Sequence, residues 1–128
     1  MGNFEIRADI AKNRFYVILQ GFITDVQAKE CADTSIAEAK KLKPGFDVIS
    51  DVSTAKPASP QGVVELLRTQ TYLKEHGMGR VIRVVPPQPT VAAMQIARTA
   101  KEAGYDVDTA TSIEEAEKML EDQKKKPH

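Results

Sequence analysis

The residues that could carry chemistry are few and widely spaced. The two histidines, His76 and His128, lie far apart in the sequence, and neither belongs to a cluster of His, Cys, Asp or Glu at metal-ligand spacing. No glycine-rich loop follows a strand-like segment, so the sequence predicts no phosphate cradle. The G-x-S-x-G turn that exposes a nucleophilic serine is also missing. We therefore predict a chain that is not an enzyme and holds no cofactor and no metal ion.

The single cysteine, Cys31, falls on the apolar face of a predicted helix, beside Ala28 and Ala32. This position is typical of an inert buried thiol. One cysteine excludes an internal disulfide and is consistent with a reducing compartment. The first residues lack the pattern of a secretory signal, and no apolar stretch reaches the roughly 20 residues of a membrane span. The sequence thus predicts a cytoplasmic protein without a membrane span.

Asp51 ends a strand-like segment, as does the phosphorylated aspartate of receiver domains in two-component signalling. Those domains also have acidic residues after their first strand and a lysine late in another strand. This chain opens with two strand-like segments instead, and residues 80–85 contain no lysine. The sequence therefore disfavours a receiver domain.

The bulk composition narrows the classes of partner. The chain has 18 basic and 18 acidic residues, so it lacks the positive excess typical of nucleic-acid binders. Aromatic residues make up 5% of the chain and none is tryptophan, which leaves few platforms for stacking bases or sugars. We predict no nucleic-acid partner.

Hydrophobic periodicity predicts alternating strands and helices. Residues 4–8 alternate apolar and polar side chains, whereas residues 15–19 are apolar enough for a strand buried on both faces. Two strands so close in sequence must pair antiparallel. The patterns T-x-x-Q at Thr24 and S-x-x-E at Ser112 predict capping boxes. The predicted strands are 4–8, 15–19, 46–52, 80–85 and 105–110, and the predicted helices begin after residues 24, 59, 90 and 112.

This order predicts an α/β fold with a five-stranded mixed sheet and four helices. Helical crossovers make the later strands parallel, and the first strand is the antiparallel edge. We expect one domain over residues 1–121, followed by a disordered basic tail at 122–128. The edge strand at residues 4–8 has unpaired backbone groups that could pair with a second copy, so a homodimer is one predicted partner state.

The segment from Asp51 to Val63, DVSTAKPASPQGV, resembles the signature of STAS domains, the anti-sigma-factor antagonist family. That signature is D-hydrophobic-S, a short linker, and D-S-S-G-hydrophobic at the start of a helix; Asp51 and Ser53 match its first part. The order of elements over residues 4–121 is also similar to that of the family. The resemblance implies a bacterial signalling module that binds a protein partner, such as an anti-sigma factor or kinase.

The second part of the signature departs from the family. Gly62 matches the glycine of the helix start, but Ser59 stands at the usual aspartate, Pro60 at the regulatory phosphoserine and Gln61 at the following small residue. Because proline cannot accept a phosphoryl group, we expect the usual switch to be missing. Ser59 followed by Pro60 is a common helix start, with serine as the N-cap and proline as the first helical residue.

Two versions of the protein-binding hypothesis stay open. In the first, the module docks constitutively through loop 54–62 and the exposed face of the next helix. In the second, phosphorylation has moved to Ser59 or Ser53. For the residues on the helix face, an ordinary solvated surface without a partner is the alternative interpretation. The residues predicted to bind the partner are Ser53, Thr54, Ser59, Pro60, Gln61, Gly62, Glu65, Arg68, Thr69 and Tyr72.

A small-molecule or lipid-binding STAS-like domain is the alternative function. The proline-rich residues 86–89 lie beside the alanine-rich helix 91–103, and together they could roof an apolar cleft. Plain packing of a helix on a sheet explains the same small residues. An enzymatic role would need chemistry from loop 54–62.

Overall fold

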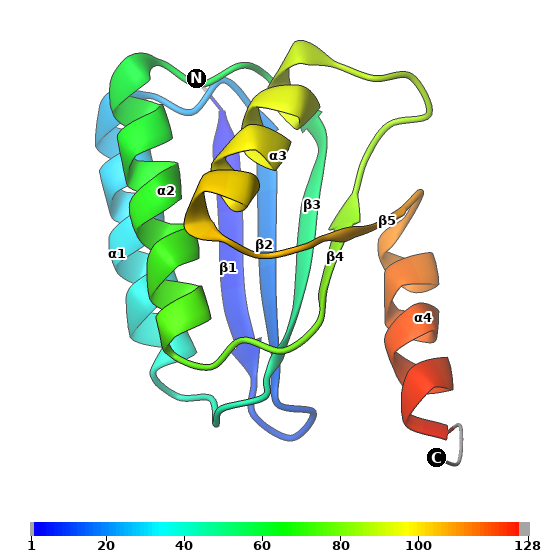
Figure 1. The fold of residues 1–128 in the computed structure, drawn as a ribbon. Coiled ribbons are helices and arrows are strands. Elements are labelled where there is room, and N and C mark those ends of the chain that lie inside the picture. Colours follow the sequence, from blue (N-terminus) through cyan, green and yellow to red (C-terminus); the bar gives the residue numbers. More distant parts are fainter. Residues whose placement is uncertain (1, 126–128) are drawn as a thin grey trace.

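The computed structural model describes residues 2–125, with side chains described through residue 122, and shows a five-stranded sheet (Figure 1). The strands lie across the sheet in chain order, and β1 pairs antiparallel with β2 while the others pair parallel. The predicted fold class is confirmed, with β1 at one edge; the homodimer through this edge stays a prediction. The strands are β1 (Asn3–Asp9), β2 (Arg14–Gly21), β3 (Asp47–Ala55), β4 (Val81–Val84) and β5 (Asp108–Ala110).

Three helices cover one face of the sheet and the fourth covers the other (Figure 1). Because the strands follow chain order, every crossover moves in the same direction along the sheet. Right-handed crossovers then place the three intervening helices on the same face. None of the described helices combines the length and apolar character that a membrane crossing requires. The helices are α1 (Asp25–Ala39), α2 (Pro60–Glu75), α3 (Val91–Ala103) and α4 (Ile113–Lys125).

Local side-chain bonds explain where α1 and α4 begin. The Thr24 hydroxyl accepts from the Gln27 N–H at 3.2 Å, and the Gln27 side chain accepts from the Thr24 N–H at 3.0 Å, which confirms the predicted capping box. At α4 the Ser112 hydroxyl accepts from the Glu115 N–H at 3.1 Å. The Glu115 carboxylate accepts instead from the Thr111 hydroxyl at 2.9 Å. The capping box predicted at Ser112 is therefore half formed: the serine bond is present, but the glutamate side chain binds Thr111 and not the N-cap backbone.

Several predicted boundaries differ from the structure, and for the strands the pairing decides where each one ends. β3 continues to Ala55 rather than residue 52, since β2 still offers Gly21 as a partner there. β5 is shorter than predicted because β4 pairs with residues 108–110 alone. α4 continues to Lys125, past the predicted domain end at residue 121, and so takes in part of the predicted tail. Residues 126–128 lie outside the described part of the chain, and the domain boundary itself stays a prediction.

The sheet has apolar side chains on both faces. Phe15, Val48 and Val81 point to the side of α1–α3, whereas their neighbours Tyr16, Ile49 and Ile82 pack under α4. This alternation explains why the strand sequences are continuously apolar. In β2 the full burial predicted for residues 15–19 holds for its first half, and residues 17–19 are half-buried.

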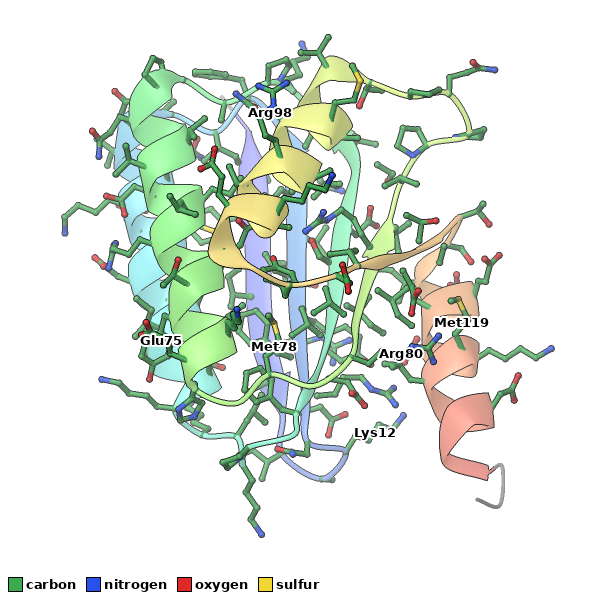
Figure 2. The ribbon with its side chains drawn as sticks, in the orientation of Figure 1. Lys12, Glu75, Met78, Arg80, Arg98 and Met119 are labelled. Atoms are coloured by element: carbon green, nitrogen blue, oxygen red, sulfur yellow. The ribbon has the colours of Figure 1, made fainter. Side chains whose placement is uncertain are left out.

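Polar contacts hold α4 against the sheet. The Tyr16 hydroxyl donates to Glu117 at 2.9 Å, and the buried Arg14 guanidinium lies 3.8 Å from the same carboxylate. Arg80 donates to the carbonyl oxygen of Met119 at 3.2 Å, and the two residues lie side by side in Figure 2. These contacts position the helix on its face of the sheet.

Candidate functional site

The carboxyl ends of the parallel strands and the N-terminal ends of all four helices lie at the same edge of the sheet, the upper edge in Figure 1. In open α/β sheets, ligands and partners bind at this edge. Helix N-termini also present free N–H groups and the positive ends of helix dipoles there. The predicted signature segment crosses this edge between β3 and α2.

Ser59 begins α2. Its hydroxyl accepts from the Gly62 N–H at 3.0 Å and donates to the Asp25 carboxylate at 2.5 Å, and Pro60 is the first helical residue. The predicted helix start is confirmed. A side chain at Gly62 would meet the Ala58 Cβ at 3.1 Å, so the loop packs closely on this turn.

Asp25 gives this edge its electrostatic character. The residue opens α1 and its carboxylate reaches the N-cap of α2, so a single negative charge lies beside the positive ends of two helix dipoles. A phosphate on Ser59 would have to lie against this carboxylate. The Ser59 hydroxyl is therefore engaged as both donor and acceptor, and a phosphate in its place would face the negative charge of Asp25.

Ser53 lies in a different setting. It belongs to β3 rather than to a loop, and its hydroxyl donates to Asp51 at 2.7 Å. The pairing of β2 with β3 shifts register here, between Ile18 and Gln20, as at a β-bulge. Ser53 alternates with the buried Val52, which faces the side of α1–α3. Ser53 and Ser59 are thus on opposite sides of the sheet.

The prediction that Glu65 lies on the exposed face of α2 is wrong. Its side chain is 12% exposed and accepts from Arg68 at 2.7 Å. Arg68, which is exposed as predicted, also donates to Asp33 of α1 at 2.8 Å. These bonds to Arg68, with a bond to Lys29, lower the pKa of Asp33. The cluster therefore holds α1 and α2 together.

Thr69 and Tyr72 are also partly buried rather than freely exposed. The Thr69 hydroxyl donates to the Glu65 carbonyl oxygen at 3.0 Å. Tyr72 stacks on His76, with ring centroids 5.6 Å apart and planes at 15°. Within residues 2–125 no group of His, Cys, Asp and Glu side chains could hold a metal ion, so His76 has a packing role in the part described.

Exposed apolar side chains mark the site more clearly than the signature does. They lie just after β2 and in the first two turns of α1, α2 and α3, near the edge described above, and Val64 also borders a shallow pocket between α1 and α2. Sequence reasoning missed them, although apolar residues outside a helix's inward stripe are a readable signal. We call this set the edge patch: Phe22, Val26, Val64, Val91 and Met94.

Two further predictions, on the Cys31 thiol and on the apolar cleft, compare differently with the structure. Cys31 is partly buried, and this burial raises the pKa of its thiol to about 11, which is in line with the predicted inert thiol. The cleft predicted under residues 86–89 is wrong in its position. The cavity lies deeper, between the sheet and α1–α3, and residues 86–89 do not line it.

Comparisons with known proteins find a likeness among solved structures. No protein-family model matches the chain. No curated protein matches it significantly by sequence. Among solved structures, the chain is similar to the unphosphorylated form of the anti-sigma factor antagonist SpoIIAA, with a TM-score of 0.56 and 16% identity over 97% of this chain and 100% of that one.

The chain has the SpoIIAA fold. This finding confirms the resemblance to STAS domains that the signature and the element order suggested. At 16% identity the likeness establishes the arrangement of helices and strands.

Proposed function

We propose that the chain is a non-enzymatic regulatory module that binds a protein partner through the edge patch. The carrying observation is the gathering of exposed apolar side chains at one edge of the sheet. The fold it shares with SpoIIAA, an anti-sigma factor antagonist, supports a regulatory role. We infer that the partner is an anti-sigma factor or a related signalling kinase and that both proteins act in the cytoplasm.

The chemistry of the edge favours a protein partner. Single exposed apolar side chains are normal on a protein surface, but several of them near a ligand-binding edge are typical of an interaction site. Polar and charged residues surround the patch, among them Lys56, Gln61 and Asp25. An apolar centre with a polar rim is the usual anatomy of a protein interface.

We infer further that docking is constitutive. Pro60 has no hydroxyl at the position of the family's phosphoserine, and the Ser59 hydroxyl is engaged by Gly62 and Asp25. A phosphate adds nearly two negative charges, which Asp25 would repel. These contacts support a module without the usual switch.

An intact-mass measurement tests whether the phosphorylation switch is missing. The wild-type chain, incubated with its candidate anti-sigma kinase and ATP, is expected to keep its intact mass. The variant Pro60→Ser is expected to gain one phosphate, because it restores a hydroxyl at the first helical position, where serine is tolerated. A stoichiometric phosphate on Ser59 of the wild-type chain would contradict constitutive docking.

A binding measurement tests whether the edge patch is the docking site. In calorimetric titration with the candidate anti-sigma factor, Val91→Glu is expected to weaken affinity by about tenfold or more, since burying an unpaired carboxylate in an interface costs more than about 1.4 kcal/mol. The matched control is Ile10→Glu in the β1–β2 hairpin. Ile10 is 66% exposed and Val91 is 65% exposed, but Ile10 lies at the opposite end of the sheet (Figure 1). Equal affinities of the two variants would refute the docking site.

A further inference from the structure

A cavity of about 100 Å³ lies between the sheet and α1, α2 and α3. Small residues on the helices leave this space open, among them Ala28, Ala32 and Gly62. The rest of the lining is mainly apolar and comes from β2, β3 and β4. A cavity of this character, of the order of the roughly 150 Å³ that accommodates benzene, is large enough for a small organic molecule.

One buried cation lines this apolar space. Arg83 of β4 is 4% exposed, and its Nε has no hydrogen-bond partner among the described residues. Among the described residues, no carboxylate forms an ion pair with the Arg83 guanidinium. Burial lowers the pKa of Arg83, and the nearby Tyr105 hydroxyl partly offsets this effect. The Tyr105 hydroxyl solvates this guanidinium but does not neutralise it, and a buried charge without a counterion is costly, so its presence points to an anion that joins it.

Arg14 shows how this fold treats a buried arginine elsewhere. It lies under α4, and Glu117 and Tyr16 both contact its guanidinium. Arg83 is equally buried on the other face but has no such carboxylate. The Nε of Arg14 is unpaired as well, so the two arginines differ in the carboxylate that lies beside Arg14, where Arg83 has the Tyr105 hydroxyl instead.

A second polar atom lies unpaired in the same cavity. Gln70 of α2 is buried, and its side-chain oxygen has no hydrogen-bond partner among the residues described here. A donor on Arg83 and an acceptor on Gln70 thus line one apolar space. Both groups are polar points in an otherwise apolar wall, as in typical ligand sites, and of the two only the Arg83 donor can pair with an anion.

We propose that the cavity binds a small monocarboxylate, with its carboxylate on Arg83 and its hydrocarbon part among the apolar side chains. A single buried guanidinium matches a head with one negative charge, and a planar carboxylate fits its fork of N–H donors. The volume limits the ligand to about five carbon atoms. This site goes beyond the edge patch and does not depend on it.

At the end of the cavity nearest the signature segment, a side chain of α3 binds the loop backbone. Gln95 of α3 accepts from the Ala58 N–H at 2.8 Å and donates to the Ala58 carbonyl oxygen at 3.1 Å. Both residues line the cavity. The ligand site therefore lies directly beneath the loop that leads into α2.

The test is an NMR titration of the full chain with pentanoate, followed at the Arg83 Nε–H resonance and at the backbone amides that line the cavity. We expect saturable shifts at both. Pentanamide has the same shape without the charge, and we expect it to bind at least about tenfold more weakly, because the charged head gains about 1.4 kcal/mol or more from the guanidinium. The variant Arg83→Met is expected to lose pentanoate affinity by a similar factor.

The matched control is Arg98→Met, since Arg98 is exposed on the outer side of α3 (Figure 2) and pentanoate should bind this variant as it binds the wild type. Equal affinity for pentanoate and pentanamide would overturn the proposal, and this comparison needs no variant to fold. The absence of any saturable shift with pentanoate would also overturn it, because the cavity would then hold water only. Neither result bears on binding at the edge patch, which calorimetry measures separately.

Discussion

Replacing Phe46 by alanine is expected to lower the free energy of unfolding by about 3–5 kcal/mol. Phe46 is fully buried just before β3, in a cluster with Phe15, Leu73 and Val81. The ring also packs at 5.9 Å from the His76 ring. The strands and α2 converge on this ring, so neighbouring groups cannot close the space that its loss would leave. Urea unfolding followed by circular dichroism measures the change.

The control for this variant is Phe22→Ala, which removes the same side chain from the surface. Phe22 is 41% exposed, whereas Phe46 is 0% exposed. We expect the free energy of unfolding of Phe22→Ala to change by no more than about 0.5 kcal/mol. A similar loss in both variants would show that the cluster around Phe46 does not hold the domain together as the packing indicates.

Replacing Glu117 by alanine is expected to destabilise the domain by about 2 kcal/mol. The change leaves the buried Arg14 guanidinium without its carboxylate and the Tyr16 hydroxyl without its acceptor. Removing one partner of a fully buried ion pair costs about 3–5 kcal/mol. The effect here is smaller because the Glu117 side chain is 32% exposed and water can replace part of the lost contact.

Two further variants test the cause of this loss. Glu114→Ala removes an exposed carboxylate from the same helix, and we expect its unfolding free energy to stay within about 0.5 kcal/mol of the wild type. Combining Glu117→Ala with Arg14→Met removes the stranded charge, so the double variant should be more stable than Glu117→Ala alone. If the double variant is less stable instead, the loss arises from packing and not from an uncompensated charge.

The arrangement of elements could be predicted because each depends on neighbours in the sequence. Apolar periodicity defined the strands and helices, and Thr24 and Ser59 defined two helix starts through bonds to residues three positions away. The short spacing between the first two strands required an antiparallel pair. Strand ends could not be predicted in the same way, because Ala55 stays in β3 through its pairing with Gly21 of another strand.

The candidate site was harder to predict because its residues are defined by contacts between distant elements. Glu65 was expected on an open surface, but Arg68 and Asp33 draw it into the contact between α1 and α2. Arg83 stands in a strand of apolar residues, and the sequence cannot show that its guanidinium lacks a carboxylate. That property depends on which acidic side chains the other elements bring to the cavity.

The strand order has a consequence for how the protein is made. Each strand that leaves the ribosome finds its only earlier neighbour already synthesised, because the sheet is built from β1 to β5 in chain order. No strand has to insert between two existing ones, so the nascent sheet can grow at one edge as synthesis proceeds. α4 is the last of the described elements to emerge, and the apolar face formed by Tyr16, Ile49 and Ile82 stays uncovered until then. Translation therefore completes the face with α1–α3 first and closes the other face last.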